Sequence, residues 1–415
     1  MSGFQRSFAK SKLSSFSTLD ELSDEEESKD SNLEHQKQQL GLNIDQQEDE
    51  ESLSGSSVAS TTTIKPILKS QDDSTSSSSI SRPLVGSVKK RVFTPLTWAS
   101  FFEREFYIES ETNSIKVTHH AYIILPVNDK APLFVMHHGA GSSGLSFAQL
   151  AIEIRKKLPS AGILSIDARG HGLTKISPTP VVIDLSLDIL SEDLLLIIDQ
   201  TRKKFMWKEI PPLVLVGHSL GGAVITNIAK STRLDGNLLC FAVIDVVEGS
   251  AIDALKSMQT YLFSRPSNFN SLDSAIEWHI HSRTIRNPKS AQVSVPALLK
   301  DIADSSYSWS WRTDLAATQP FWESWFSGMS KKFLEGRASK LLLLAGTDRL
   351  DTELMIGQMQ GKFALQIFPE AGHFIHEDLP ERVALVIVDF YNRNNRRALV
   401  LPPKVDDMLR AGKKI

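Results

Sequence analysis

A serine stands between two glycines at residues 217–221, which read Gly-His-Ser-Leu-Gly and match the pattern G-x-S-x-G. A serine hydroxyl becomes a nucleophile when a nearby base takes its proton and a carboxylate orients that base. The pattern suits this chemistry where a strand precedes the serine and a helix follows it, because the sharp turn between them lifts the hydroxyl above the sheet edge. A Gly/Ser-rich surface turn is the alternative interpretation, and the flanking segments decide between the two.

The segments on either side of Ser219 have the required character. Residues 213–216 form a continuous apolar run, which is typical of a parallel strand covered on both faces. Residues 223–228 resume with helical spacing, and glycines at 217, 221 and 222 leave room where strand and helix backbones nearly touch. The sequence therefore predicts Ser219 as a nucleophile at a strand–turn–helix elbow.

The base is sought among the histidines that follow Ser219, because in α/β-hydrolases the acid and then the histidine come after the nucleophile. His279 and His281 fall in a helical insert. His373 lies in the loop that leaves the last predicted strand, and that loop ends beside the elbow in a doubly wound sheet. We predict His373 as the base, with His376 as the reserve.

Two aspartates compete for the role of the acid. Asp348 lies in the loop after the penultimate predicted strand, and Asp245 ends the strand that follows the elbow helix. Both loops lie at the catalytic edge of a parallel sheet, so spacing alone does not separate them.

An ester-cleaving serine also needs two N–H donors for the oxyanion. One is expected from Leu220, the residue after the nucleophile. The other is expected from the loop after an earlier strand, residues 137–144 (HHGAGSSG), and we choose Ala140.

The same loop permits a competing interpretation. Residues 139–144 read G-x-G-x-x-G between a predicted strand and helix, and Asp167 ends the next strand, as in dinucleotide-binding folds. We prefer the hydrolase interpretation, because the elbow, a downstream Gly-His and a His-Gly loop occur in the right order; measurable binding of NAD would reverse this preference. No spacing of His, Cys and carboxylates suggests a metal site, so neither a cofactor nor a metal is expected. Arg169 in the tight loop at residues 167–172 is a candidate for holding an anion or the nearby backbone.

Strands alternate with helices over most of the chain, which predicts an α/β fold with a mostly parallel central sheet and helices on both faces. Between residues 247 and 339 the strand pattern stops, and we interpret this Trp-rich segment as a helical lid insert. The stripe Phe321, Trp322, Trp325 and Phe326 is expected to be lid core. Strands are expected at residues 115–125 (an edge strand), 133–136, 163–166, 213–216, 239–244, 341–344 and 363–368, and helices at 147–157, 185–204, 223–228, 352–360 and 381–391.

Composition bounds the remaining possibilities. Residues 1–87 are rich in Ser and acidic residues and are predicted to be a disordered tail, the catalytic domain is placed at residues 88–396, and residues 397–415 are predicted to be a basic tail. The net charge of −3 with 41% hydrophobic residues shows no global bias toward nucleic acid or membrane. The single cysteine, Cys240, is expected in a buried strand; it excludes an intrachain disulfide and favours the cytoplasm or the nucleus. Lys89-Lys90-Arg91 is read as a charged linker rather than a nuclear-import signal.

Several blocks together resemble the protein phosphatase methylesterase family. They are residues 217–223 (GHSLGGA), 244–249 (IDVVEG), 276–278 (IEW), 285–287 (IRN) and 356–363 (IGQMQGKF), with Gly372-His373 followed by His376-Glu377-Asp378. The resemblance spans residues 91–396 and leaves out the N-terminal tail. It implies an α/β-hydrolase fold and a triad acid at Asp245, with Asp348 as a structural loop residue beside Arg349. Some members have a glycine where this chain has Ala140.

The function that the resemblance implies is a serine carboxylic-ester hydrolase acting on protein, of the glutamate/leucine carboxyl methylesterase type. Its substrate is the methyl ester on the C-terminal leucine of the catalytic subunit of protein phosphatase type 2A, and that phosphatase is the expected partner of an otherwise monomeric chain. The alternatives are a small-molecule carboxylesterase with the same triad and a non-catalytic protein that binds the phosphatase.

Overall fold

The computed structural model describes residues 92–112, 114–180, 183–302, 308–346 and 350–395. The predicted tails at residues 1–87 and 397–415, the Lys89-Lys90-Arg91 linker, Asp348 and Arg349 lie outside the described residues. The domain boundaries at residues 88 and 396 therefore stay predictions.

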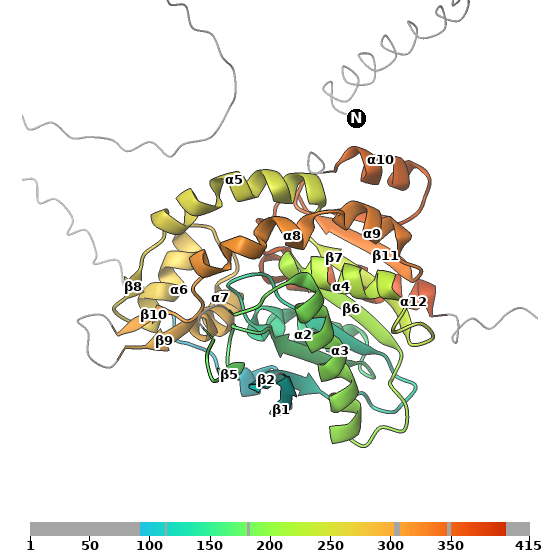
Figure 1. Cartoon of the computed structure of the whole chain (residues 1–415), viewed down its shortest axis with the longest axis horizontal. Coiled ribbons are helices and arrows are strands. Elements are labelled where there is room, and N and C mark those ends of the chain that lie inside the picture. The colour runs from blue at the N-terminus through green and yellow to red at the C-terminus, as the bar shows by residue number, and fades with distance from the viewer. Residues whose placement is uncertain (1–91, 113, 181–182, 303–307, 347–349, 396–415) are drawn as a thin grey trace, which may run out of the picture. The chain divides into compact units, whose positions relative to one another are not determined.

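The main sheet crosses the middle of the molecule (Figure 1). Its strands follow the spatial order β1-β2-β4-β3-β6-β7-β11-β12, and β5 pairs with β2. The pairs from β4 to β12 are parallel, whereas β1–β2 and β2–β4 are antiparallel. The strands are β1 (Arg104–Thr112), β2 (Ile115–Ile124), β3 (Leu133–His137), β4 (Gly162–Asp167), β5 (Lys175–Ser177), β6 (Leu213–His218), β7 (Leu238–Ile244), β11 (Ser339–Leu344) and β12 (Ala364–Ile367).

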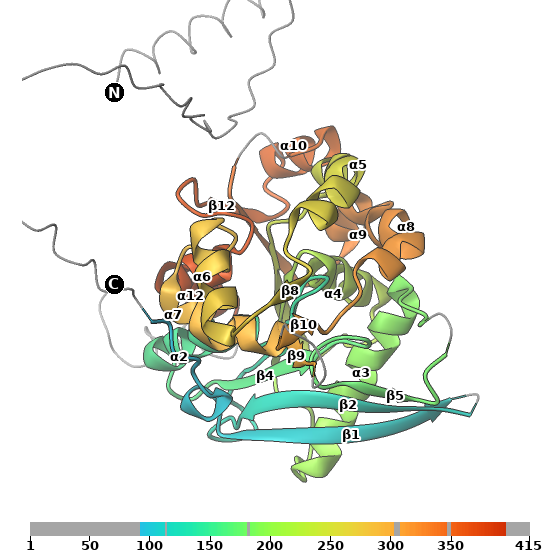
Figure 2. The same ribbon diagram turned by 90° about the vertical axis from the view of Figure 1, so that its left-hand side faces the viewer.

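Helices cover both faces of this sheet (Figure 2), and the alternation of side chains along the strands explains how. Phe134 and Met136 of β3 pack in one apolar cluster with α2 and α12, whereas Leu133 and Val135 pack in another with α3 and α4. A strand buried on both faces needs a continuous apolar run, which is the pattern seen at residues 133–136 of β3 and 213–216 of β6. The helices around the sheet are α2 (Ala148–Lys157), α3 (Leu187–Lys204), α4 (Leu220–Ser231), α10 (Thr352–Met359), α11 (Ile375–Asp378) and α12 (Pro380–Asn394).

The predicted mostly parallel α/β sheet is confirmed, and Cys240 is fully buried in β7 as expected. The prediction that residues 115–125 form an edge strand is wrong. Strand β2 has β1 on one side and β4 on the other, so β1 occupies the edge. Strand β1 was not predicted, because only Phe106 and Ile108 of this strand are buried and residues 109–112 are all polar, which leaves the period-two pattern too short to detect.

The insert at residues 247–339 is helical, as expected, but it also contains a small antiparallel sheet that was not predicted. Its strands β8 (Asn268–Phe269), β9 (Leu299–Asp301) and β10 (Trp309–Trp311) pair in the order β8-β10-β9. Strands of two or three residues carry too short a pattern to be detected in sequence. The helices of the insert are α5 (Glu248–Ser264), α6 (Leu272–His281), α7 (Pro288–Ser294), α8 (Trp322–Phe326) and α9 (Met329–Glu335).

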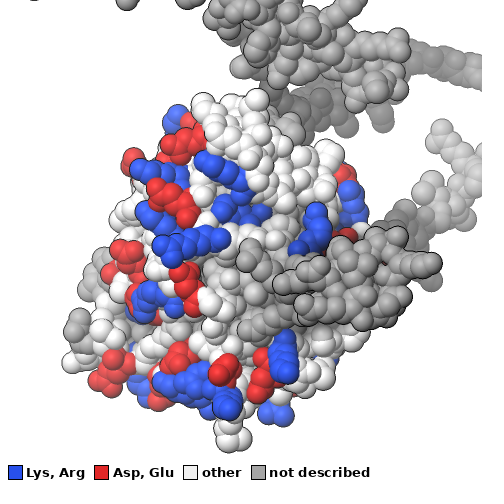
Figure 3. All heavy atoms as spheres, turned by 90° about the vertical axis from the view of Figure 1, so that its right-hand side faces the viewer, with Lys and Arg blue, Asp and Glu red and all other residues white. Residues whose placement is uncertain are grey.

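Charge is mixed on the face of the molecule drawn in Figure 3, where Lys and Arg side chains are interspersed with Asp and Glu among the described residues. In the part of the chain that the structure describes, no helix combines the length and apolar character needed to cross a bilayer.

Candidate active site

Ser219 occupies the turn between β6 and α4 and has a strained backbone, with φ 51° and ψ −119°. Residues other than glycine rarely adopt positive φ. The close approach of the flanking elements explains the glycines: a Cβ at Gly217 would lie 2.2 Å from the Gly221 carbonyl oxygen, and one at Gly221 would lie 2.0 Å from the His137 carbonyl oxygen. The structure therefore has the predicted elbow, with Ser219 at its apex.

His373 and Asp245 are brought together, although 128 positions separate them in the chain. His373 Nδ1 lies 2.8 Å from Asp245 Oδ2, and the Ala345 N–H donates to Asp245 Oδ1 at 2.9 Å. The Asp245 side chain is fully buried, whereas the His373 side chain is 46% exposed. A buried carboxylate at Nδ1 leaves the other ring nitrogen of His373 available to act as a base.

Ser219 and His373 line the same cavity, and within the described residues the structure records no hydrogen bond between the Ser219 hydroxyl and the His373 ring. Such catalytic hydrogen bonds are often long in proteins without substrate and tighten in the complex. The histidine–carboxylate contact is thus already formed, and the contact with the serine remains to be made.

His218 fixes the backbone of the candidate base. Its Nε2–H donates to the His373 carbonyl oxygen at 2.9 Å, so the ring links the elbow strand to the loop that carries His373. Burial, followed by the charges of the neighbouring histidines, holds the pKa of His218 well below its usual value, and the ring therefore stays neutral. This contact was not predicted, and the one signal of it in the sequence is that His218 is adjacent to Ser219.

His376, the reserve base, is fully buried beside His218, and the centroids of the two rings lie 4.6 Å apart. Its Nε2 lies 3.3 Å from the Ser146 hydroxyl, and its ring stacks on Phe147 with centroids 4.5 Å apart. Burial lowers the pKa of His376 to about 3. It packs as a structural residue behind the site.

The loop at residues 139–144 lies directly over the elbow, since a Cβ at Gly139 would be 3.0 Å from the Ser219 Cβ. The next loop along the sheet edge holds it in place. The Gly141 N–H donates to His171 Nε2 at 2.9 Å, and the Gly144 N–H donates to Asp167 Oδ1 at 2.7 Å. These contacts were not predicted, because they join two loops that meet only in the folded chain.

These bonds also bear on the dinucleotide interpretation and on the oxyanion donors. Asp167 is buried and holds His120 Nδ1 at 2.7 Å, so its carboxylate is engaged within the protein rather than presented to a ribose.

The two candidate oxyanion donors differ from their neighbour Gly141, whose N–H is already bonded to His171. Ala140 lines the cavity beside Ser219. Leu220 begins α4, where the first N–H groups have no preceding helical turn to bond with. Arg169, considered for an anion, instead binds both oxygens of Asp193, at 2.8 and 2.7 Å.

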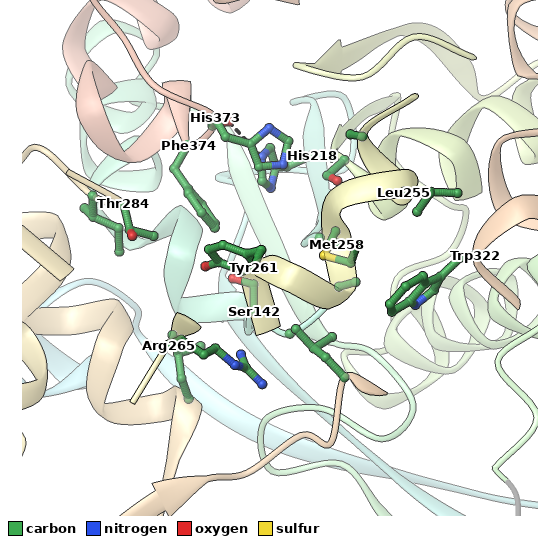
Figure 4. A pocket seen from close by; sticks show the side chains of 18 of the residues that line it. Ser142, His218, Leu255, Met258, Tyr261, Arg265, Thr284, Trp322, His373 and Phe374 are labelled. Atoms are coloured by element: carbon green, nitrogen blue, oxygen red, sulfur yellow. Dashed lines mark hydrogen bonds between the residues drawn. The ribbon is translucent and has the colours of Figure 1, made fainter. Parts of the chain in front are cut away.

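A mainly apolar cavity of about 460 Å³ opens beside Ser219 and His373 (Figure 4). Helix α5 contributes Leu255, Met258 and Tyr261 to its wall. Trp322, Trp325 and Phe326 both line the cavity and pack in the main apolar cluster, so the predicted stripe serves as core and as wall. Glu377 also reaches the cavity, and burial holds the pKa of this carboxyl well above its usual range. Among the described residues no cluster of His, Cys, Asp and Glu is arranged to hold a metal ion.

Known proteins with related sequences place this site in context. A model of the alpha/beta hydrolase family matches residues 134–385. The chain is 53% identical over 411 residues to the Neurospora crassa protein named protein phosphatase methylesterase 1, with 88% of each chain covered. It is 59% identical over 332 residues to the Gibberella zeae protein of the same name, with 80% of this chain and 82% of that protein covered.

Among solved structures, that of E-2-(acetamidomethylene)succinate hydrolase aligns with a TM-score of 0.55 at 16% identity, over 70% of this chain and 100% of the other. That likeness supports the fold. The family follows from the sequence matches, and the predicted resemblance is confirmed: the chain belongs to the alpha/beta hydrolase family and, within it, to the protein phosphatase methylesterase 1 family.

Proposed function

We propose that this chain is a serine esterase that removes the methyl ester from the C-terminal leucine of the catalytic subunit of protein phosphatase type 2A. The name shared by its relatives supports a methylesterase acting on a phosphatase. The observation that carries the chemistry is the contact of 2.8 Å between His373 Nδ1 and the buried Asp245, in a cavity shared with the strained Ser219.

In the proposed mechanism, the Ser219 oxygen attacks the carbonyl carbon of the ester while His373 Nε2 takes the hydroxyl proton. The N–H groups of Leu220 and Ala140 donate to the oxyanion. Asp245 holds the ring and stabilises its cation. The bond to the methoxy oxygen then breaks, and methanol leaves with the proton from His373. A water molecule attacks the acyl-enzyme in the same way and frees the leucine carboxylate and the Ser219 hydroxyl.

The leaving group offers little for recognition, because one methyl group in an apolar pocket is worth only about 1–3 kcal/mol. Selectivity must therefore come from the rest of the substrate. An apolar cavity is common to sites for small molecules and for peptide ends, so it is the name shared by the relatives that favours a protein ester over a small, soluble one.

The substrate is tested by comparing kcat/KM for the carboxymethylated phosphatase catalytic subunit with kcat/KM for short p-nitrophenyl esters. We expect the phosphatase to be preferred by at least about 100-fold, because binding energy from remote parts of a substrate is spent at the reacting centre. Fast cleavage of the small esters with no loss of methyl groups from the phosphatase would instead identify a small-molecule carboxylesterase.

A further inference from the structure

Arg265 projects into the catalytic cavity from the end of α5, across the cavity from His218 and His373 (Figure 4). Its guanidinium carbon lies 4.4 Å from the centroid of the Trp311 ring. Trp311 is itself fixed, because its Nε1–H donates to the Pro266 carbonyl oxygen at 2.7 Å and its ring packs edge-on against Phe269. The guanidinium therefore lies over a ring that is itself held by a hydrogen bond and by aromatic packing.

In the part of the chain that the structure describes, the Arg265 guanidinium makes neither an ion pair nor a hydrogen bond. No carboxylate therefore contacts its charge directly. Burial lowers the pKa of Arg265, and Tyr261 and Asp314 are the groups that oppose this shift. Asp314 is exposed, and its carboxylate accepts the Ala316 and Ala317 N–H groups. A partly desolvated cation without a contacting anion is costly unless something compensates it.

Other arginines near the site are engaged. Arg169 binds Asp193 with two bonds, and Arg312 donates to two backbone carbonyl groups. Arg283 is the second arginine that lines the cavity, but it is exposed, and its charge acts on the nearby Asp378. Among the described residues that line the cavity, Arg265 is thus the half-buried arginine whose guanidinium makes no hydrogen bond.

The chemistry of the substrate indicates which group the N–H donors of Arg265 would bind. The methyl ester caps the C-terminus of a protein, so when its carbonyl group lies at Ser219 the rest of the substrate precedes the methylated residue. Any group that reaches the far side of the cavity belongs to a residue upstream of it. A planar guanidinium matches a carboxylate with two parallel N–H···O bonds, and the apolar wall around it strengthens such a pair.

We propose that Arg265 binds a carboxylate side chain of the substrate, a few residues upstream of the methylated C-terminus. The inference rests on the proposed function and adds a determinant of specificity to it. Arg265 with Trp311 forms an acidic-residue subsite, while the apolar remainder of the cavity holds the intervening residues.

The test uses labelled alanine hexapeptides that end in leucine methyl ester, with Asp or the matched Asn at each of the five preceding positions. Binding to the Ser219→Ala variant is measured by fluorescence anisotropy, so that no turnover occurs. At one position we expect Asp to bind at least about 10-fold more tightly than Asn, because a hydrogen bond to a charged group contributes about 1.5–3 kcal/mol. Equal affinities at every position, or no measurable binding of any peptide, would overturn the inference.

Variants at the two cavity arginines complete the test. Arg265→Gln in the Ser219→Ala background should abolish the preference for Asp, and Arg265→Lys should retain only part of it, because lysine lacks the fork. Arg283→Gln should leave the preference for Asp intact. If this variant loses the preference and Arg265→Gln keeps it, the subsite lies at Arg283 and the inference is wrong. The comparison of Asp peptides with Asn peptides is made on protein that retains Arg265, so it does not depend on an Arg265 variant that could misfold. Failure of the proposed function is distinguishable, since it appears as retention of methyl groups on the phosphatase with unaltered Arg265.

Discussion

At the scale of single residues, the two oxygens of the Asp245 carboxylate make different contacts. Oδ2 orients His373 and Oδ1 accepts the N–H of Ala345, so the acid is anchored to the end of the neighbouring strand β11. Its backbone has a positive φ of 52°, which residues other than glycine rarely adopt. Asp245 is the better candidate acid for these reasons, and Asp348 stays untested because it lies outside the described residues.

Replacement of Asp245 by asparagine should lower kcat by about 10⁴-fold with little change in Tm, because an amide that donates to Nδ1 stabilises the wrong tautomer of His373. Steady-state kinetics on the methylated phosphatase, with thermal unfolding alongside, measure both quantities. Asp348→Asn is the matched control and should keep nearly full turnover. A larger loss in the control than in Asp245→Asn would transfer the role of the acid to Asp348.

At the scale of elements, the site depends on two backbone segments that pack against each other. The elbow joins β6 to α4, and the loop at residues 139–144 crosses over it. The ring of His171 ties this loop to the next one, accepting the Gly141 N–H and donating from Nδ1 to the Arg169 carbonyl oxygen at 2.9 Å. Burial lowers the pKa of His171, so the ring remains an acceptor at neutral pH.

Loss of the His171 ring should disturb the candidate oxyanion donor at Ala140, which precedes Gly141. We expect His171→Ala to lower kcat by about 100-fold with little change in KM, the size of effect found when one oxyanion donor is removed. His171→Gln keeps one acceptor and one donor and should restore part of the rate. A change in KM alone, or equal rates for the two variants, would argue against a role in positioning the loop.

The elbow tolerates no side chain at Gly221. Gly221→Ala should lower the free energy of unfolding by more than about 4 kcal/mol, because the new methyl group would overlap the His137 carbonyl oxygen at 2.0 Å. Gly249→Ala is the matched control, since the nearest atom to its Cβ is 3.4 Å away and the residue lies in α5. Urea denaturation measures both variants; a soluble Gly221→Ala protein as stable as the control would contradict the packing described here.

The sequence predicted those elements whose signal is continuous and local. Strands β3, β6 and β7 are apolar runs, and the elbow is a five-residue pattern, so both could be found without coordinates. The sequence did not reveal what depends on pairing across the fold, such as the bond from His218 to the His373 carbonyl oxygen. For the same reason the sequence could not decide between Asp245 and Asp348. Strands β7 and β11 are parallel neighbours, so their carboxyl ends lie at one edge of the sheet.

At the scale of the whole molecule, neutral histidines are part of the interior. Burial lowers the pKa of His137 and of His279 to about 4 and that of His376 to about 3. In the unfolded chain these rings would protonate near the ordinary histidine pKa of 6.5. Below that pH the unfolded state binds more protons than the folded state, so stability falls as pH falls.

Acidification from pH 7 to pH 5 should therefore cost about 2 kcal/mol of folding stability for each such histidine. Urea denaturation at a series of pH values measures the total. His376→Phe keeps an aromatic ring against Phe147. In this variant the loss of folding stability between pH 7 and pH 5 should be smaller by about 2 kcal/mol, the contribution of one histidine. An unchanged pH dependence in this variant would mean that His376 is protonated in the folded protein.

The central claim is that the Ser219 hydroxyl attacks the methyl ester of the phosphatase. The most direct measurement follows methyl groups on the carboxymethylated catalytic subunit during incubation with the unaltered protein and with Ser219→Ala, while binding of each to the phosphatase is measured separately. The account predicts complete loss of demethylation in Ser219→Ala with binding unchanged. Demethylation that persists in the bound Ser219→Ala variant would contradict it.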